Sequence, residues 1–189
     1  MTTLLLRPVE APANPPSNDA AVSGRLLHPA ADPTFLGVGE LLAIAEGLAV
    51  SAHSWPGTDR PTRRSWDVMV ASDTFEAWVI AWPAGGAIDL HDHGGSSGAI
   101  VVASGELTET TVTERPDGLA STETTVLRAG MSTTFAAPHI HDMGNLGTVP
   151  AISVHAYSPR LSEMTHYEMA DGRLVTGPTV RYRFGAAIP

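Results

Sequence analysis

Two histidines that are one residue apart, His91 and His93, offer the most direct chemistry in this chain of 189 residues. In an extended segment, side chains two positions apart point to the same side, so both imidazoles can reach one metal ion. Neutral imidazole is a ligand for iron, zinc, copper and nickel. The same H-x-H spacing also occurs in solvated polar loops. The pair alone therefore leaves both a metal site and a polar loop open.

Glycines frame this pair of histidines at fixed distances. Gly85 precedes His91 by five intervening residues, Gly98 follows His93 after four, and Gly105 follows Gly98 after six. The frame resembles the first motif of the cupin superfamily, G-x5-H-x-H-x3,4-E-x6-G. Gly98 stands in the place of the motif's glutamate, so the resemblance implies a metal site without this carboxylate.

A third histidine lies in a second frame farther along the chain. This frame resembles the second cupin motif, G-x5-P-x-G-x2-H-x3-N, and consists of Gly130, Ala136, Pro138, His141 and Asn145. Ala136 and Pro138 replace the proline and the glycine of that motif. Only His141 has an asparagine four positions on, so the resemblance selects His141. We interpret His139 as an incidental histidine at the entrance of a strand.

The predicted metal ligands are therefore His91, His93 and His141. Three neutral nitrogen ligands leave coordination positions open for a substrate and an oxidant, as a catalytic metal requires. Without a carboxylate at position 98, less negative charge surrounds the ion. We expect such an ion to favour an anionic ligand such as a thiolate.

The segment AISVHAYSP contains a second polar pattern, in which apolar residues alternate with Ser153, His155 and Tyr157. In a strand, these three polar side chains share one face. If both faces are buried, the polar row needs hydrogen-bond partners. A relay from Ser153 through His155 to Tyr157 supplies them and directs the tyrosine hydroxyl into the site. A half-exposed strand with its polar face in water remains the alternative.

Together, HDHGGSSGAIVVASGELTET, HDMGN and ISVHAYSP resemble the cysteine dioxygenase family of thiol dioxygenases, over roughly residues 64 to 170. The resemblance implies a cupin that binds Fe(II) through His91, His93 and His141. It also implies that Tyr157 orients substrate and O2, and that His155 and Ser153 hold this tyrosine.

The cysteine-oxidising members of the family bind the carboxylate of their substrate with an arginine on a strand upstream of H-x-H. Arg64 is our candidate, with Arg63 and Arg160 as rivals. Ser158–Pro159 matches the pocket-lining Ser-Pro of the family, for which a cis peptide is implied.

Animal members of the family carry a cysteine that cross-links to the active-site tyrosine. The matching position here is Gly98, and the chain contains no cysteine. The resemblance therefore implies that Tyr157 is free. The absence of cysteine also excludes disulfides and a catalytic thiol.

The predicted function is an iron-dependent thiol dioxygenase that uses O2 to oxidise a small thiol carboxylate, with L-cysteine to cysteine sulfinate as the leading reaction. The alternative substrates are 3-mercaptopropionate and mercaptosuccinate, although Ser158–Pro159 favours cysteine because the 3-mercaptopropionate type usually lacks that proline. A non-enzymatic cupin that binds a metal or small ligand is an alternative of another class. It leaves the row of Ser153, His155 and Tyr157 without a purpose.

Short β-like runs separated by turn residues must position these groups. From about residue 64 onward they read WDVMV, FEAWVIAW, AIVVAS, LTETTVTE, TETTVLRA, MSTTFAA and AISVHAYS. Many short strands predict an all-β fold; with the resemblance, this is a cupin with a jelly-roll-like β-barrel and one or more N-terminal helices. ADPTFLGVGELLAIAEGLAVSA predicts one helix, with Asp32 as its cap and Pro33 in its first turn.

Composition limits the partners. Residues 1–31 are rich in proline and predict an arm, and residues 32–189 predict a single domain. The net charge of −9 and the lack of a Lys/Arg-rich run disfavour nucleic acid and anionic membranes. We find no signal peptide and no apolar run of about 18 residues, so we expect a cytoplasmic protein. The expected partners are a small-molecule thiol and O2, bound by a monomer or small homo-oligomer.

Overall fold

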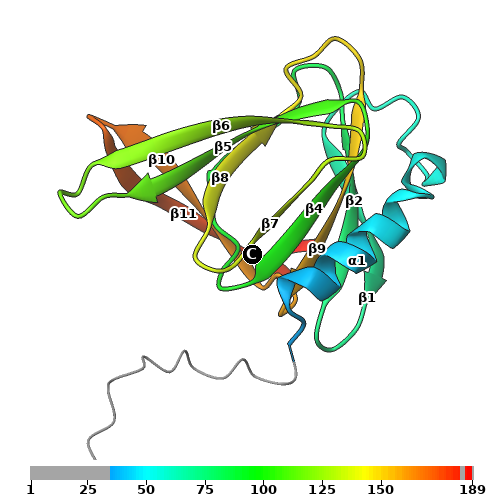
Figure 1. The fold of residues 1–189 in the computed structure, drawn as a ribbon, viewed down its shortest axis with the longest axis horizontal. Helices are drawn as coiled ribbons and strands as arrows, with labels where there is room; N and C mark the ends of the chain where they lie inside the picture. Colours follow the sequence, from blue (N-terminus) through cyan, green and yellow to red (C-terminus); the bar gives the residue numbers. More distant parts are fainter. Residues whose placement is uncertain (1–34, 184–185, 189) are drawn as a thin grey trace, which may run out of the picture. The chain divides into compact units, whose positions relative to one another are not determined.

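The computed structural model describes residues 35–183 and 186–188, which form two antiparallel β-sheets (Figure 1). The five-stranded sheet has the order β1–β2–β9–β4–β7. Its strands are Ser65–Ala71 (β1), Glu76–Trp82 (β2), Ala151–Ser158 (β9), Ser97–Ser104 (β4) and Ser132–Phe135 (β7). Strand β9 pairs with β2 on one side and β4 on the other, so it is the central strand of this sheet.

The seven-stranded sheet has the order β12–β11–β10–β3–β8–β5–β6. Its strands are Ala186–Ile188 (β12), Arg173–Arg183 (β11), Glu163–Ala170 (β10), Ala87–His91 (β3), Ile140–Gly144 (β8), Glu106–Glu114 (β5) and Ala120–Arg128 (β6). The residue pattern did not predict β3, β8, β10, β11 or β12. Strands β3 and β8 are short and interrupted by aspartate and histidine, so they lack the apolar run that marks a strand.

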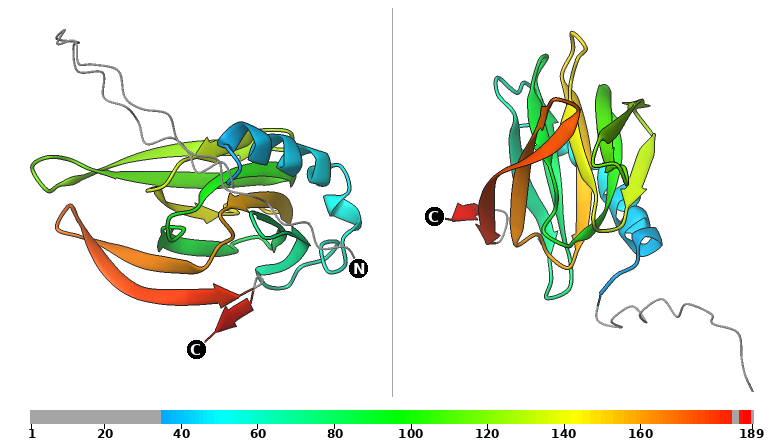
Figure 2. Two further views of the ribbon diagram at one scale, coloured as in Figure 1. Left: turned by 90° about the horizontal axis from the view of Figure 1, so that it is seen from below. Right: turned by 90° about the vertical axis from the view of Figure 1, so that its left-hand side faces the viewer.

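Apolar side chains from both sheets fill the space between them, and Figure 2 shows the two layers. The five-stranded sheet contributes Trp78, Ile80, Trp82, Ile100, Val102 and Tyr157, and the other sheet contributes Leu107, Leu127, Met143 and Met164. Two antiparallel sheets packed in this way confirm the predicted all-β, jelly-roll-like architecture. The two sheets do not join into a closed barrel.

Helix α1, Val38–Ala49, covers the other face of the five-stranded sheet (Figure 1). Leu41 and Ala45 are fully buried there. The helix begins where the Glu40 carboxylate accepts a hydrogen bond of 2.9 Å from the Gly37 N–H, which satisfies a free donor of the first turn. Residues 35–37 are not helical, so α1 begins later than the predicted start near Asp32. Asp32 and Pro33 themselves lie outside the described residues.

Residues from the two histidine frames tie the ends of the sheets together. The side chain of Asn145, just after β8, donates a hydrogen bond of 3.1 Å to the carbonyl of Trp82 at the end of β2. The backbone of Asn145 accepts from the Gly85 N–H and donates to the Gly86 carbonyl, both at 2.9 Å. Gly85 has a φ of 76°, a conformation that favours glycine. This turn fixes β8, which carries His141, against the end of β2.

The predicted arm of residues 1–31 lies outside the described residues, so the boundary at residue 32 stays a prediction. Within the described part of the chain, no helix is long and apolar enough to cross a membrane.

Candidate metal centre

Three histidines come together in the interior between the sheets. His91 is the last residue of β3, His93 lies two positions beyond it, and His141 is in β8. Each is 3% exposed or less. Their candidate ligand atoms all lie within 4.8 Å of one another. Three converging ring nitrogens can hold one metal ion, and imidazole suits iron, zinc, copper or nickel.

Hydrogen bonds orient two of these rings. The Nδ1 atom of His91 lies 2.8 Å from the backbone carbonyl of Asp89, and Nδ1 of His141 lies 2.6 Å from Oε1 of Glu109. Both partners are pure acceptors, so each Nδ1 must carry the proton. The Nε2 lone pairs of His91 and His141 are therefore left available to a metal ion.

His93 is held in a different way. Its ring stacks on Phe135, with a centroid distance of 4.5 Å and an interplanar angle of 25°, and it also lies 5.4 Å from the ring of Tyr157. Both ring nitrogens of His93 are buried, and neither has a hydrogen-bond partner among the described residues. A buried nitrogen without a partner is costly, and a bound cation would satisfy it. The donor set therefore fits a metal ion.

Burial keeps all three histidines neutral. It lowers the pKa of His91 and of His93 well below the ordinary value, and the neighbouring His141 lowers both further. Burial also lowers the pKa of His141 itself, although Glu109 opposes this shift. A ligating histidine must be deprotonated, so low pKa values leave the three lone pairs free for a metal at neutral pH.

An aromatic ring occupies the place where the first cupin motif carries its glutamate. Gly98 of β4 pairs with Phe135 of β7 on one side and with Tyr157 of β9 on the other. A Cβ atom built on Gly98 would clash with the Phe135 ring. Because Phe135 fills this side-chain space, position 98 has no room for a carboxylate or a thiol unless the ring moves.

A row of hydrogen-bonded side chains on β9 faces the histidines from the opposite sheet. Ser153, His155 and Tyr157 are 4% exposed or less. Ser153 Oγ lies 2.8 Å from Nε2 of His155, and Nδ1 of His155 lies 3.2 Å from the Tyr157 hydroxyl. Both faces of β9 are buried, so the alternative of a polar face in water is wrong.

One arrangement of protons satisfies this row. The Trp82 indole N–H, which can only donate, donates to Ser153 Oγ over 2.9 Å. The Ser153 hydroxyl then donates to Nε2 of His155, and His155 donates from Nδ1 to the oxygen of Tyr157. In the reverse arrangement the Ser153 proton has no acceptor among the hydrogen bonds of the described residues. The favoured arrangement leaves the Tyr157 hydroxyl proton free to point into the interior.

The protonation of His155 and Tyr157 fits this arrangement. Burial, with a further effect of His141, lowers the pKa of His155 to about 3, so its ring carries one proton at neutral pH. Burial also raises the pKa of Tyr157 well above its usual value, although the charge of Arg64 opposes this rise. Tyr157 is therefore a neutral hydrogen-bond donor.

Arg64 lies partly buried just before β1, close to this row. Its guanidinium carbon is 4.8 Å from the ring centre of Trp82 and 5.3 Å from that of Trp66, distances typical of cation–π contacts. Its Nε is buried without a hydrogen-bond partner. In residues 35–183, no ion pair joins Arg64 to a carboxylate. Its charge contributes to the low pKa of His155 and of His91.

The two rival arginines lie in other surroundings. Arg63 is exposed. Arg160 lies close to the buried carboxyl group of Glu76, where its charge opposes the rise in pKa that burial causes. The Ser158–Pro159 peptide just before Arg160 is cis, as the resemblance implies. Of the three candidates, Arg64 is the one whose charge reaches both the relay and the histidine cluster.

Three residues that the sequence analysis did not single out contact the centre, namely Trp82, Glu109 and Phe135. Their contacts depend on strand pairings that residue spacing does not reveal. Glu109 alone carried a local signal, because it lies two positions from the buried Leu107 and alternation places both on the inner face of β5. An acidic residue at an inward position of a strand calls for a buried partner.

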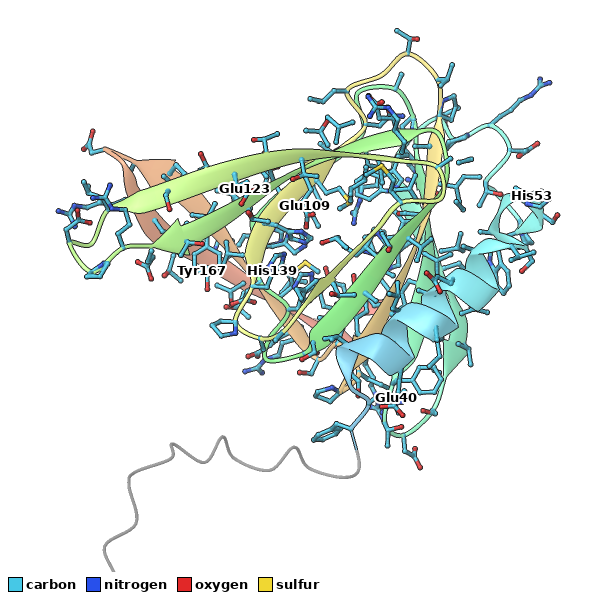
Figure 3. The ribbon with its side chains drawn as sticks, viewed as in Figure 1. Glu40, His53, Glu109, Glu123, His139 and Tyr167 are labelled. Carbon is cyan, nitrogen blue, oxygen red and sulfur yellow. The ribbon has the colours of Figure 1, made fainter. Side chains whose placement is uncertain are left out.

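His139 also lies at the centre rather than apart from it (Figure 3). Its ring stacks on Phe135 at a centroid distance of 4.5 Å, and its Nε2 is 3.5 Å from Oε1 of Glu109. Glu109, His139 and His141 thus form a second group that can hold a metal ion. In this group, however, the Glu109 oxygen and the His141 nitrogen already bond to each other at 2.6 Å. The three-histidine group has no such internal bond.

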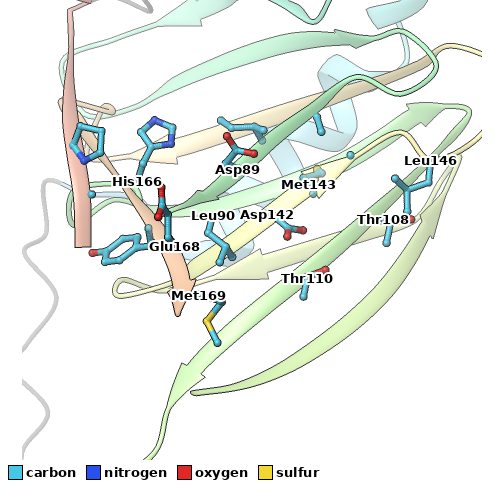
Figure 4. Close-up of a pocket in the computed structure, with 16 residues that line it drawn as sticks. Asp89, Leu90, Thr108, Thr110, Asp142, Met143, Leu146, His166, Glu168 and Met169 are labelled. Atoms are coloured by element: carbon cyan, nitrogen blue, oxygen red, sulfur yellow. The ribbon is translucent and has the colours of Figure 1, made fainter. Parts of the chain in front are cut away.

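A groove on the outer surface of the seven-stranded sheet is separate from the histidine cluster (Figure 4). Its lining includes Leu90, Thr108, Thr110, Asp142, His166 and Met169. Thr108 and Thr110 alternate with the inward Leu107 and Glu109, so they face away from the centre. None of the three clustered histidines lines this groove.

Comparison with known proteins identifies a family and several remote structural likenesses. No curated protein matches the chain. Among solved structures, TT1209 from Thermus thermophilus is 24% identical with a TM-score of 0.45, over 53% of this chain and 88% of that one. A double-stranded β-helix protein of Klebsiella pneumoniae is 17% identical, with a TM-score of 0.42 over 76% and 96% of the two chains. An oxalate decarboxylase from Lactobacillus farciminis, in complex with formate, is 16% identical, with a TM-score of 0.46 over 54% and 30%.

These structural likenesses are too remote to carry an argument. The family model is different, because cysteine dioxygenase type I matches residues 34–170, well over half of the chain. The matched segment includes the histidine cluster, the Ser153–His155–Tyr157 row and Arg64. The chain therefore belongs to the cysteine dioxygenase type I family.

Proposed function

We propose that this protein is an Fe(II)-dependent thiol dioxygenase that oxidises a small thiol carboxylate, with L-cysteine as the leading substrate. In this proposal His91, His93 and His141 are the metal ligands, Tyr157 is the catalytic hydrogen-bond donor, and Arg64 binds the substrate. The observation that carries it is the pairing of a carboxylate-free, three-histidine cluster with a buried tyrosine relay in one interior.

The reaction converts R–SH and O2 into R–SO2H, so both oxygen atoms end on sulfur and no other reductant is needed. Sulfur loses four electrons and dioxygen gains four. When bound, iron supplies a ligation site that stabilises the thiolate and the redox chemistry with dioxygen. Three protein ligands leave room for such ligands on the ion.

The contribution of Tyr157 is a fixed hydrogen bond. The row of Ser153 and His155 uses the tyrosine oxygen as an acceptor, so the hydroxyl proton points toward the space beside the histidines. A donor held in a buried site stabilises negative charge that develops on a reacting oxygen. The Tyr157 pKa, which burial raises, keeps this proton on the tyrosine throughout.

The contribution of Arg64 is to bind and orient the substrate. A guanidinium pairs with a carboxylate through two parallel hydrogen bonds. Trp66 and Trp82 fix the Arg64 side chain, and no protein carboxylate among the described residues forms an ion pair with it. These contacts support a thiol that also carries a carboxylate, of which L-cysteine, 3-mercaptopropionate and mercaptosuccinate are the candidates.

Oxygen uptake by iron-loaded protein tests the proposal. L-Cysteine, 3-mercaptopropionate and mercaptosuccinate are compared with cysteamine, which has a thiol and an amine but no carboxylate. We expect turnover of at least one carboxylate, with one sulfinate formed per O2 consumed, and far less turnover of cysteamine. Metal binding without turnover of any thiol would contradict the proposal and would favour a non-enzymatic, metal-binding cupin.

Arginine variants test the assignment of Arg64. We expect Arg64→Gln to raise KM for the carboxylate substrate and to lower kcat/KM by about 10-fold or more, because a bidentate, charge-assisted contact is lost. Arg63→Gln is the matched control, since Arg63 is adjacent in sequence and exposed. Equal effects of the two substitutions would show that Arg64 is not the carboxylate ligand.

A further inference from the structure

A buried carboxylate lies one layer behind the proposed metal ligands. Glu109 of β5 is 3% exposed, and its Oε1 lies 2.6 Å from Nδ1 of His141 and 3.5 Å from Nε2 of His139 (Figure 3). The first distance is that of a short, charge-assisted hydrogen bond, and the second is longer than a hydrogen bond. Glu109 is therefore principally a partner of His141.

The geometry of this contact is that of an ionised carboxylate. At 2.6 Å from Nδ1 of His141, the Glu109 oxygen accepts a short, charge-assisted hydrogen bond in a buried position. Burying a charge without partners is very costly, and its position beside two histidines offsets that cost. An anion is thus placed next to a ring that faces the centre.

The three histidines differ in their outer partners. Nδ1 of His91 donates to a neutral carbonyl, that of Asp89, and His93 has no hydrogen-bond partner on either nitrogen among the described residues. His141 alone of the three donates to a charged group. A carboxylate on Nδ1 fixes the tautomer of a ligating histidine, orients its ring and makes its Nε2 a stronger base.

The position of this negative charge is also informative. The first cupin motif places its carboxylate at position 98, where this chain has Gly98 and the space is filled by Phe135. Glu109 supplies an anion from β5 instead, through His141, without taking a coordination position. Glu109 thus adds a negative charge beside the histidine cluster without belonging to the three-histidine group.

We propose that Glu109 is a positioning residue that fixes the tautomer of His141 and strengthens it as a metal ligand, in place of the carboxylate missing at position 98. This inference rests on the proposed three-histidine iron site. It predicts that removing the charge at Glu109 weakens Fe(II) binding. Removing this charge should also raise the Fe(III)/Fe(II) reduction potential, because a nearby anion stabilises the more highly charged Fe(III) ion.

The experiment measures anaerobic Fe(II) affinity by competition with a chromophoric chelator. Glu109→Gln keeps the shape and a hydrogen-bond acceptor but removes the charge, and we expect it to bind Fe(II) about 10- to 100-fold more weakly. Glu109→Asp keeps the charge at a greater distance and should recover part of the loss. The matched control is Glu106→Gln on the same strand, where Glu106 forms a half-exposed ion pair with Arg128 at 3.0 Å.

Two further readouts separate this role from a merely structural one. The reduction potential should rise in Glu109→Gln and remain unchanged in Glu106→Gln. In the metal-free protein, nitrogen-15 shifts should show His141 protonated on Nδ1, and Glu109→Leu should populate the other tautomer. If Glu109→Gln fails to fold, Glu109→Asp and the tautomer of His141 in the wild type still test the contact.

The outcomes distinguish this inference from the proposed function. If the wild type binds Fe(II) and Glu109→Gln matches its affinity and potential, the inference is overturned while the proposed function stands. A His141 ring protonated on Nε2 in the metal-free wild type would also overturn it. A wild type that binds no Fe(II) overturns both.

Discussion

The two sheets contribute to the centre in different ways. The relay comes from successive inward positions of β9, a central strand that pairs in register with β2 along its whole length. Two of the three proposed ligands come from irregular places, because His91 ends β3 and His93 lies beyond it, whereas His141 lies within β8. Strand β3 meets β10 at the single pair of His91 and His166, and its register with β8 shifts before His91.

This difference corresponds to two ways of fixing a side chain. On β9, the regular backbone already aims the polar row, and Ser153, His155 and Tyr157 satisfy one another. On the seven-stranded sheet the backbone does not suffice, and outer contacts orient each ring. The carbonyl of Asp89, the carboxylate of Glu109 and the ring of Phe135 perform this role for the three histidines. Substitutions in the two sheets should therefore impair the protein differently, either in Fe(II) binding or in kcat.

The largest effect is expected from His141→Ala, which removes one of the three proposed metal ligands. Loss of one of three ligands should cost more Fe(II) affinity than the roughly 10- to 100-fold of an outer contact, and thiol oxidation should be abolished. His139→Ala is the matched control, since His139 shares Glu109 and Phe135 with His141 but is not a proposed ligand. Iron content and oxygen uptake measure both. If His141→Ala kept its full iron content and His139→Ala lost iron, then His139 rather than His141 would be the third ligand.

The next largest effect is expected in the row of Ser153, His155 and Tyr157, where a substitution should lower activity without lowering Fe(II) affinity. Tyr157→Phe keeps the ring but removes the hydroxyl, and we expect kcat to fall about 10²- to 10³-fold, as for other preorganised donors. Fe(II) affinity should stay near that of the wild type. Ser153→Ala, two steps from the hydroxyl, should cause a smaller loss in kcat. A Tyr157→Phe variant that lost its iron instead would mean that the two sheets do not act separately.

The same contrast explains how much of the molecule could be predicted from sequence. Alternation along β9 was enough to place Ser153, His155 and Tyr157 on one face, because a strand has a fixed period of two. The histidines required the spacing of two distant frames. Glu109 and Phe135 could not be placed, since their contacts depend on β5 pairing with β8 and on β7 pairing with β4. No local pattern encodes such a register.

The overall fold was accessible because turn residues separate clear apolar runs. Its unpredicted strands include β3 and β8, which carry the histidines, and polar residues at a functional site break the pattern that identifies a strand. The helix was found, but its start was placed too early. A capping contact between Gly37 and Glu40 determines that start, and Asp32 offered a competing signal.

A third prediction concerns the pH dependence of the free energy of unfolding, to which the buried His155 contributes. In the unfolded chain a histidine binds a proton near pH 6.5, whereas burial lowers the pKa of His155 to about 3 in the folded protein. The unfolded state then binds more protons between these values, so the free energy of unfolding falls as pH decreases below about 6.5. One such group contributes about 1.4 kcal/mol per pH unit. The clustered histidines shift in the same direction and add to this slope.

Urea unfolding of the metal-free protein between pH 7 and pH 5 measures this slope. His155→Gln should make it shallower by up to about 1.4 kcal/mol per pH unit, because one titrating group is removed. His53→Gln is the control, since His53 is exposed. Equal slopes in the wild type and in His155→Gln would mean that His155 is protonated in the folded protein.

The smallest effect tests the contact between Gly98 and Phe135, two paired residues of the five-stranded sheet, of which Phe135 also stacks on His93. In Gly98→Ala, the new methyl group meets the Phe135 ring in a closely packed interior. Overpacking of this kind costs about 1–3 kcal/mol, and the displaced ring should disturb the stacking that holds His93. We expect a lower free energy of unfolding, measured with urea, and a modest loss of Fe(II) affinity.

Gly39→Ala is the matched control, because Gly39 lies in α1 and a Cβ there meets nothing within 4 Å. Replacing an exposed helical glycine with alanine should stabilise the protein by up to about 1 kcal/mol, so the two substitutions should have opposite signs. The double variant Gly98→Ala/Phe135→Leu should recover part of the lost stability, since the shorter side chain makes room for the methyl group. Additive losses in the double variant would instead mean that the Phe135 ring is not what excludes a side chain from position 98.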